Sequence, residues 1–528
     1  MAALTNNRRI PRPATGRRQC GTSTAGSSSD PSGHERRHRN HTDIAVIGGN
    51  LVGAAAAVAI ASSDAFADRQ VTLIERREVR FPDDLDRWTN RVYAITPGTK
   101  DFLLKIKVWQ KLKHQHIHLC RRMVVWENFS DAALHFCGQE MQFRDGSSEA
   151  DVVCYNIDQH TLLYAIYERL RELPNVLIRD KTRITKAHLP RAHTSDAKTS
   201  RKSSTEAGQP NEPIRLEIFG DDETSTCDLL VAADGFNSPI RKLMGVRNVS
   251  WSYKQKSVIA VVDLDGMQDV DGIAFQRFVP DGVVALLPLG NKQACLIWSL
   301  VDSAAEYMLR LPDDQFINYL NEHIHGTLDY NEAVMSVLHG TQLVMNSVGL
   351  TQSATGKGIQ APRVIGVQPQ TRAAYPLGMG HAVQYVGPRA VLVGDSAHRV
   401  HPLAGQGANF GFSDVECLSR HLNDAAFRGE RIGSPGALAA YERERQCALL
   451  PFQVAIEGLI HIYQNNNLPI VMARSLGVQI LDALPYVKQK NCTVRCSITV
   501  FLYIYINYSV CLQLPIRKFP CNERDLVD

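Results

Sequence analysis

The residues best suited to chemistry lie in one stretch, "VLVGDSAHRVHPLAGQGAN", at 391–409. A buried apolar strand is predicted to end at Asp395, whose carboxylate can accept hydrogen bonds from the hydroxyl groups of ribose or ribitol. Gly405 and Gly407 then precede a helix that we expect to begin near Ala408. The N-terminus of a helix stabilises negative charge on a neighbouring group. This order of residues favours a site for a polyol chain joined to a flat, reducible ring.

A glycine-rich turn, "GGNLVG", follows the apolar run "DIAVI" and is the second candidate site. In a dinucleotide site the first glycine makes the turn, the second lets the backbone approach the diphosphate, and the third packs the helix on the strand. Asn50 stands at the second of these positions, and we interpret it as tolerated because Asn adopts positive φ more readily than most residues. Such a turn alone is often only structural. The residues expected near a diphosphate are Gly48, Gly49, Asn50, Val52 and Gly53.

Two further passages favour nucleotide binding. Glu75 ends the next predicted strand, "QVTLIERRE", where an acidic side chain can bond a ribose diol. In "DLLVAADGFNSPIRKLMG", Asp234 and Gly235 lie between a third strand and a helix, although a simple Asp-Gly turn would give the same pattern. Because two independent features agree around 43–78, we predict a nucleotide site.

No catalytic side chain is assigned from the sequence. His398 and His401 follow Asp395 on a predicted turn, where a structural role is favoured over that of a general base. "CTVRC" (492–496) has the wrong spacing for zinc and no histidine nearby, so no metal site is predicted.

The elements that position these residues follow from hydrophobic periodicity. A strand at 43–49, a helix at 51–63 and a strand at 70–78 form a βαβ unit. A helix is expected at 158–172, and the polar stretch 190–213 is interpreted as a flexible loop between two strands of one hairpin. Period-two patterns with turn residues predict antiparallel strands between Ser257 and Leu300, and helices follow from Asp414 to about Leu484.

Composition narrows the class of protein. The chain has 528 residues and a formal net charge of +4, but its first 42 residues hold eight Arg against Asp30 and Glu35. The remainder is slightly acidic, so no nucleic-acid partner is expected. The Arg- and Ser-rich start without an apolar core predicts a mitochondrial transit peptide, the alternative being a disordered basic tail. No apolar run reaches the length of a membrane span; "ITVFLYIYI" has nine residues.

Three motifs in order, "GGNLVG…E", "ADGFNSPIR" and "GDSAHRVHPLAGQGANFG", resemble those of FAD-dependent aromatic hydroxylases of the p-hydroxybenzoate hydroxylase type. The longer sequence around these motifs, together with "AFQRFVPDGVVALLPL", resembles the flavin monooxygenases of ubiquinone biosynthesis. The N-terminal segment, which looks like a transit peptide, resembles that of their mitochondrial members. The implied fold class is α/β: an FAD-binding Rossmann-like domain with an inserted antiparallel β-sheet substrate domain and C-terminal helices. The resemblance runs from about Asp43 to Lys490.

The resemblance also implies an activity, namely hydroxylation at C5 of a polyprenyl-4-hydroxybenzoate-type ring by FAD and O2. Electrons would come from ferredoxin and its reductase, or otherwise from NAD(P)H. It further implies a place in a complex of ubiquinone-biosynthesis proteins and a peripheral position on the matrix face of the mitochondrial inner membrane. Two alternatives remain open: a flavin hydroxylase of another aromatic or isoprenoid substrate, and a non-catalytic scaffold of the biosynthetic complex.

Residue by residue, the resemblance places the diphosphate at Gly48, Asn50, Gly53, Asp234 and Gly235 and the adenosine ribose at Glu75. It places the ribityl chain at Asp395. Residues near the cofactor would be Arg91 and Gln159, with Gly405, Gly407, Ala408 and Asn409 beside the isoalloxazine; substrate-wall residues would be Phe275, Arg277 and Leu287.

The implied division of the chain has five parts. These are a transit or disordered segment at 1–42, the first part of the FAD-binding domain at 43–250, a mainly substrate-binding sheet at 251–385, the second FAD-binding part with helices at 386–490, and an atypical tail at 491–528. The sequence departs from the family pattern at Asn50, at Asp158-Gln159 where Glu-Asn is usual, and in the tail.

Overall fold

The computed structural model describes residues 41–82, 85, 87–127, 133–137, 152–190, 212–219, 224–266, 271–279, 282–326, 360–402, 405–464 and 470. Residues 1–40 of the predicted transit segment, nearly all of the 190–213 loop and the 491–528 tail lie outside these residues, whereas His41 and Thr42 begin β1 (His41–Ile47). The described residues from Thr42 onward belong to one unit by their internal contacts.

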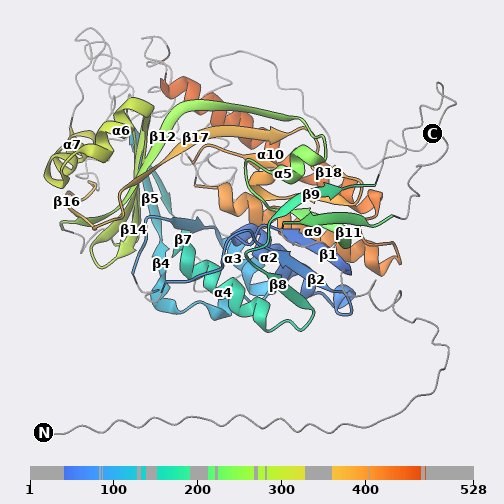
Figure 1. The fold of residues 1–528 in the computed structure, drawn as a ribbon. Coiled ribbons are helices and arrows are strands. Elements are labelled where there is room, and N and C mark those ends of the chain that lie inside the picture. The colour runs from blue at the N-terminus through green and yellow to red at the C-terminus, as the bar shows by residue number, and fades with distance from the viewer. Residues whose placement is uncertain are drawn as a thin grey trace, which may run out of the picture. The chain divides into compact units, whose positions relative to one another are not determined.

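The first sheet carries the predicted βαβ unit (Figure 1). Strands β1 and β2 pair in parallel, as do β2 with β8 and β11 with β19. Ala233 N–H donates to the Ile47 carbonyl, so the carboxyl ends of β11 and β1 lie together. The strand order is β18 (Val386–Gly387), β19 (Ala390–Leu392), β11 (Ser225–Ala232), β1 (His41–Ile47), β2 (Val71–Ile74) and β8 (Val176–Arg179).

The predicted hairpin is confirmed, because β9 (Ile184–His188) pairs antiparallel with β10 (Ile214–Ile218), and β10 pairs with β11. The predicted helices 51–63 and 158–172 are confirmed as α2 (Leu51–Ala61) and α4 (Gln159–Arg171). The small alanine side chains of α2 let the helix approach the sheet closely, and its apolar residues pack with the sheet in one large core. Short elements of this part are η1 (Asp64–Phe66), α3 (Pro97–Lys105), η2 (Trp109–Lys111), η3 (His114–His116) and α5 (Pro239–Leu243).

The second sheet has the antiparallel hairpins that period-two patterns predicted. Its order is β20 (His398–Arg399), β17 (Ala373–Ala382), β12 (Asn248–Leu264), β15 (Gln293–Val301), β14 (Gly282–Gly290), β13 (Ile273–Val279), β5 (Arg122–Glu127) and β6 (Ala133–Cys137). Strand β16 (Val364–Val367) pairs with β12, and helices α6 (Asp302–Arg310) and α7 (Asp313–His325) share the core of this sheet.

Two strands of this sheet come from the segment assigned to the first part of the nucleotide-binding domain. β5 pairs in parallel with β13, and β6 extends the edge. Local periodicity predicts a strand but not its partner, which is why the sequence did not place them here. A small third sheet has the order β3 (Val92–Ile95), β7 (Cys154–Asp158) and β4 (Ile117–Cys120), and its strands flank β5 and β6 in the chain.

The helical C-terminal region consists of α9 (Gly407–Phe427) and α10 (Pro435–Gln464) among the described residues. The predicted start of α9 near Ala408 is confirmed. Asp395 lies not at the strand end but in the turn η6 (Gly394–Ser396), because β19 ends at Leu392. Within the described parts of the chain, no helix combines the length and the apolar character needed to span a membrane.

Candidate cofactor site

The loop between β1 and α2 is a tight backbone cradle. Gly48 has φ +103°, and a Cβ there would lie 2.4 Å from the Ala233 carbonyl oxygen. A Cβ on Gly53 would lie 1.9 Å from the carbonyl oxygen of Gly48. These two glycines are therefore required by the turn and by the close approach of the helix to the strand.

Asn50 does not use a positive φ. Its φ is −81°, and its side-chain Oδ1 accepts from Leu51 N–H at 2.9 Å, which caps α2. The sequence-based reason for tolerating Asn50 is thus wrong, and helix capping is the better explanation, since Asn is among the preferred capping residues. The side chain is held against its own helix rather than over the loop.

Glu75 binds the same loop. Its Oε2 accepts from Gly49 N–H at 2.6 Å, and its Oε1 accepts from Arg77 N–H at 2.9 Å. The carboxylate remains partly accessible just after β2. Tyr167 of α4 completes the support by donating its hydroxyl to the Gly49 carbonyl at 2.9 Å.

A row of polar side chains leads from Asn50 to the second sheet. Gln159 Nε2 donates to Asn50 Oδ1 at 3.3 Å, and Arg91 Nη1 donates to Gln159 Oε1 at 3.5 Å. Arg91 Nε in turn donates to the Tyr375 hydroxyl at 3.0 Å, and its guanidinium lies 5.1 Å from the Tyr375 ring centroid. Asp158, beside Gln159, caps α4 and accepts from Thr89 at 2.8 Å and 2.6 Å. The structure brings together three predicted residues and adds Tyr375.

Asp234 and Gly235 follow β11 at the same edge of the sheet. One Asp234 oxygen accepts from Ile240 N–H at 3.1 Å, whereas Oδ1 is buried and has no partner among the described residues. Burial raises the pKa of this carboxyl. Gly235 has φ +85°, and a Cβ there would meet no atom of the described residues within 4 Å. An unsatisfied acceptor beside open space suits a ligand that carries hydroxyl groups.

Asp395 is accessible to solvent, yet protein atoms crowd around it. That desolvation raises the pKa of its carboxyl, against the opposing charges of His398 and Arg399. Burial, followed by the charge of Asp395, raises the pKa of Tyr93 to about 12, so Tyr93 keeps its proton at neutral pH. Sequence reasoning did not select Tyr93, which lies on β3 within an ordinary apolar alternation.

The start of α9 faces open space. Gly405 has φ +61°, and a Cβ on Gly405 or Gly407 would meet no described residue within 4 Å. Asn409, by contrast, turns inward: its Nδ2 donates to the Ala94 carbonyl at 2.9 Å and its Oδ1 accepts from Thr96 N–H at 3.1 Å. Asn409 therefore anchors α9 to β3 and α3. Val52 also packs inward, since a Cβ on Gly394 or Gly411 would lie 3.1 Å or 2.5 Å from its methyl groups.

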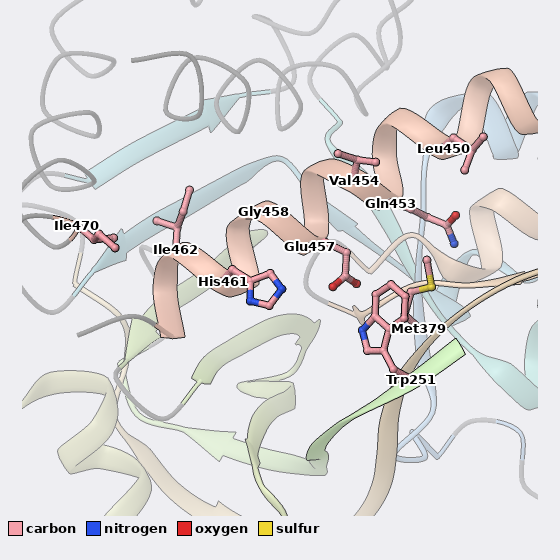
Figure 2. A pocket seen from close by; sticks show the side chains of 10 residues that line it. All are labelled: Trp251, Met379, Leu450, Gln453, Val454, Glu457, Gly458, His461, Ile462 and Ile470. Atoms are coloured by element: carbon pink, nitrogen blue, oxygen red, sulfur yellow. The ribbon is translucent and has the colours of Figure 1, made fainter. Parts of the chain in front are cut away.

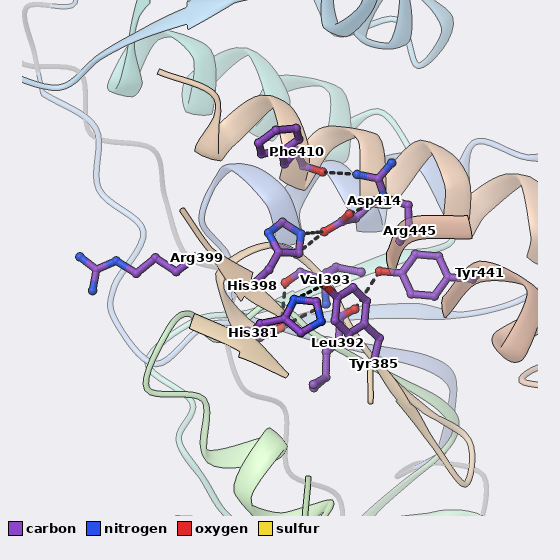
Figure 3. Close-up of polar contacts among 12 residues, drawn as sticks. His381, Tyr385, Leu392, Val393, His398, Arg399, Phe410, Asp414, Tyr441 and Arg445 are labelled. Atoms are coloured by element: carbon purple, nitrogen blue, oxygen red, sulfur yellow. Dashed lines mark hydrogen bonds and ion pairs between the residues drawn. The ribbon is translucent and has the colours of Figure 1, made fainter. Parts of the chain in front are cut away.

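A buried charged cluster around Asp414 joins η6, α9 and α10 (Figure 3). Asp414 Oδ2 contacts His398 Nε2 at 2.6 Å and accepts from Gly394 N–H at 2.8 Å, and Asp414 Oδ1 accepts from Arg445 Nε at 2.7 Å. Burial would raise the pKa of Asp414, but the charges of His398 and Arg445 hold it below its usual range. His398 is thus a structural partner, as the sequence favoured.

Two further buried side chains, Arg241 and His401, lie near this turn in the chain or contact it. Arg241 Nη1 donates to the Ser396 carbonyl at 2.7 Å, which ties α5 to η6. His401 is buried against the edge of Tyr253, and burial lowers its pKa to about 4. Asp414 could have been found as an acid within the apolar stripe of α9, but Arg241 and Arg445 carry no local signal of their role.

The proposed substrate residues lie on the second sheet. Phe275 is buried in its core, edge-on to Trp126 at 6.3 Å. Arg277 donates to the carbonyls of His323 and Gly326 at 2.9 Å each, a contact that satisfies the C-terminal end of α7. Leu287 is partly buried on β14. A contact of these three residues with substrate stays a prediction.

Comparison with known proteins identifies the class. The family model described as an FAD binding domain matches residues 41–359 and 357–449. Among solved structures, p-nitrophenol 4-monooxygenase PnpA from Pseudomonas putida superimposes with a TM-score of 0.59 at 16% identity, covering 89% of this chain and 98% of PnpA. HpxO from Klebsiella pneumoniae, complexed with FAD and uric acid, gives a TM-score of 0.57 at 15% identity, covering 88% and 97%. At this identity the likeness shows the fold, which is that of the FAD-dependent hydroxylases.

Closer relatives define the family within that class. The mitochondrial ubiquinone biosynthesis monooxygenase COQ6 of Drosophila melanogaster is 35% identical over 449 residues, 85% of this chain and 88% of the relative. The human COQ6 protein is 32% identical over 483 residues, 89% and 97% of the two chains. The chain belongs to the family of ubiquinone biosynthesis monooxygenases, and it is an FAD-dependent monooxygenase.

The described residues fit FAD. Among these residues, open space lies beside Gly235, Gly405 and Gly407, and Oδ1 of Asp234 has no partner. Two helix N-termini, those of α2 and α9, also lie at the site. Helix N-termini supply N–H donors for a diphosphate and for charge on a reduced ring. The predicted fold class and cofactor are therefore confirmed.

Proposed function

We propose that this protein hydroxylates C5 of the aromatic ring of a polyprenyl-4-hydroxybenzoate-type intermediate in ubiquinone biosynthesis. The observation that carries this proposal is the family relationship over most of the chain, together with a site in which four distant segments meet. These segments are the Gly48–Gly53 loop, the turn after β11, the turn η6, and the start of α9.

Each segment has a role in the proposal. The N-terminus of α2 and the Gly48–Gly53 loop hold the diphosphate. Glu75 accepts hydrogen bonds from the hydroxyl groups of the adenosine ribose, and the hydrogen bond from Gly49 N–H holds its carboxylate in position. Asp234 lies by the diphosphate, and Asp395 accepts from the ribityl chain. The N-terminus of α9 stabilises negative charge on the ring beside Gly405 and Gly407.

FAD, when bound, supplies electron transfer and the activation of O2. The chain's own work is to orient the ring system and to limit water around it. Arg91 is suited to orientation, because its guanidinium joins Gln159 on one side and Tyr375 of the substrate sheet on the other. Tyr93, protonated beside Asp395, can donate a hydrogen bond without adding charge.

The partners of the proposal are O2, the prenylated phenol, other proteins of ubiquinone biosynthesis, and ferredoxin with its reductase as electron donors, with NAD(P)H as the alternative donor. In this proposal the protein associates peripherally with the matrix face of the mitochondrial inner membrane. The mitochondrial designation of the relatives supports the compartment.

The test is rescue of a cell that lacks its own C5 hydroxylase. Expression of this chain is expected to restore quinone synthesis and to remove the accumulated non-hydroxylated intermediate, as followed by mass spectrometry. Purified protein should show oxidised-flavin absorbance. Flavin binding without rescue would point to another substrate, and absence of flavin after FAD supplementation would favour the scaffold alternative.

A further inference from the structure

Two cysteines face each other across the small third sheet. Cys120 at the end of β4 and Cys154 at the start of β7 are direct partners in the antiparallel register. The side chains of such partners stand on the same face of a sheet. Strand pairing therefore brings together two thiols that are far apart in the sequence. We call these two residues the thiol pair.

The two thiol groups are in contact. A hydrogen bond between them lowers the pKa of Cys120, against the opposing effect of burial. In three other buried cysteines burial has the larger effect: it raises the pKa of Cys227, and it raises the pKa of Cys295 and of Cys417 to about 12. Because the thiolate is the reactive form of cysteine, Cys120 is better prepared for oxidation than these three residues.

The other contacts of the thiol pair are weak. Cys120 Sγ donates to the Arg122 carbonyl at 3.2 Å, and Cys154 Sγ lies 3.7 Å from Asn156 Oδ1. A thiol is a poor hydrogen-bond donor, so little is lost when its proton leaves. Asn156 keeps its stronger bond, since its Nδ2 donates to the Pro288 carbonyl at 2.8 Å. A covalent bond between the sulfur atoms would thus leave the surroundings of the pair satisfied.

The backbone around the thiol pair suits a disulfide. Opposed residues of antiparallel strands have Cα atoms roughly 4.5–5.5 Å apart, and disulfides join residues whose Cα atoms are roughly 4.4–6.8 Å apart. The pair also shares a small apolar cluster with Ala274 of β13 and Leu287 of β14. A bond here would fasten β4 to β7 beside the sheet that carries the predicted substrate residues.

Burial decides which oxidant can reach the thiol pair. Cys120 is 0% exposed and Cys154 is 9% exposed, so a bulky reagent such as oxidised glutathione lacks the room to attack either sulfur. Hydrogen peroxide is small and uncharged. An FAD-dependent monooxygenase reduces O2, and two-electron reduction of O2 gives hydrogen peroxide, so this oxidant can arise in the same protein.

We propose that Cys120 and Cys154 form a modification site, at which hydrogen peroxide closes a reversible disulfide between β4 and β7. The site is distinct from the proposed FAD site, and the inference does not depend on which phenol the enzyme hydroxylates.

The reaction has two steps. The sulfur of Cys120 attacks one oxygen of hydrogen peroxide, the O–O bond breaks, and the leaving hydroxide takes up the thiol proton as water, which leaves a sulfenic acid. The sulfur of Cys154 then attacks the sulfenic sulfur, the S–O bond breaks, and a second water leaves. Two thiols are oxidised by two electrons, and one peroxide is reduced to two waters. Thiol–disulfide exchange with a small dithiol reverses the modification once the protein is unfolded.

The experiment is stepwise addition of hydrogen peroxide to the reduced, full-length, FAD-loaded protein, followed by denaturation, alkylation of the remaining thiols and peptide mass spectrometry. We expect a peptide pair joined through Cys120 and Cys154 that lacks two hydrogen atoms and separates on treatment with dithiothreitol. Met379 is the internal reference for peroxide dose, because it lines the cavity of about 430 Å3 between α10 and the strands β12 and β17 (Figure 2). The disulfide should form before Met379 gains an oxygen atom.

The matched variants are Cys120→Ser, Cys154→Ala and Cys295→Ser. Each of the first two should abolish the cross-link, whereas Cys295→Ser removes another buried thiol and should leave the cross-link intact. Flavin absorbance and circular dichroism show that each variant is folded. In concentrated urea, the share of all disulfides that joins Cys120 to Cys154 should fall at least roughly tenfold, because only the fold holds the two thiols together.

Three results would each overturn the proposal. The first is oxidation of Met379 while Cys120 and Cys154 both remain alkylatable. The second is an equal share of the Cys120–Cys154 disulfide in the folded protein and in urea. The third is attachment of glutathione to either cysteine when the folded protein is incubated with oxidised glutathione, because it would show that burial does not select the oxidant.

Discussion

At the scale of single residues, the pKa values of two aspartates beside the candidate site are shifted in opposite directions. Asp414 is fully buried but held by three hydrogen-bonding partners, so its pKa is lowered. Asp395 is accessible but crowded, and its pKa is raised. Asp414 stabilises the fold. The ionised form of Asp395 is unfavourable in the folded protein, and hydrogen bonds from the hydroxyl groups of a ligand would offset that cost.

Asp414→Asn should destabilise the protein by about 3–5 kcal/mol, because it leaves Arg445 and His398 without their counter-charge in the interior. Chemical denaturation measures this loss. Glu444→Gln is the control: its ion pair with Arg420 is about half exposed, so the change should cost less than about 1 kcal/mol. Equal effects of the two changes would contradict the structural role of Asp414.

The pH dependence of Asp414 has a fixed sign. A carboxyl with a lowered pKa in the folded state stabilises the protein above its unfolded-state pKa, and this stabilisation disappears as pH falls through the folded-state value. The difference in unfolding free energy between wild type and Asp414→Asn should therefore shrink under acid conditions.

Asp395→Asn should raise the thermal stability of the flavin-free protein at neutral pH and lower its affinity for FAD. A carboxyl with a raised folded-state pKa is unfavourable when ionised, so the gain in stability should fade as pH drops through that pKa. Melting curves with and without FAD measure both effects. Unchanged flavin affinity would remove Asp395 from the proposed cofactor site.

At the scale of elements, helix ends decide how the site is held. Asn50 caps α2, Asp158 caps α4, and Asn409 fixes the first turn of α9 to the carbonyl of Ala94. Asn50 and Asp158 are caps, whereas Asn409 ties two elements together; since Asn50 and Asn409 are themselves predicted cofactor neighbours and Asp158 adjoins Gln159, positioning and stability are coupled there.

Asn50→Ala should cost about 1 kcal/mol of unfolding free energy, whereas Asn50→Gly should cost only a few tenths, as is usual for capping residues. The glycine variant also restores the usual fingerprint. We expect its FAD affinity to equal that of wild type in a flavin-fluorescence titration, because the Asn50 side chain bonds its own helix. An affinity increase of about tenfold would show instead that Asn50 crowds the diphosphate.

At the scale of the whole molecule, local sequence patterns predicted the helices and strands but did not predict the contacts between residues far apart in the chain. The βαβ unit, α4 and the antiparallel hairpins follow from periodicity, and the three motifs led to the FAD family. The placement of β5 beside β13, the link from Arg91 to Tyr375, and the cluster around Asp414 join residues far apart in the chain. Nothing in their immediate neighbours encodes those partners, so sequence reasoning could not find them.

The adjacency of β11 and β19 has a consequence for biosynthesis. Leu230 pairs with Ala390, and everything between them must be made before the sheet can gain its last parallel strand. Pairing of strands so far apart in the chain is slow, because the entropy of closing the long loop is lost before the stabilising contacts between the strands form. A ribosome-bound chain that stops short of β19 would lack both η6 and α9, so the proposed FAD site can be completed only after these segments have been made.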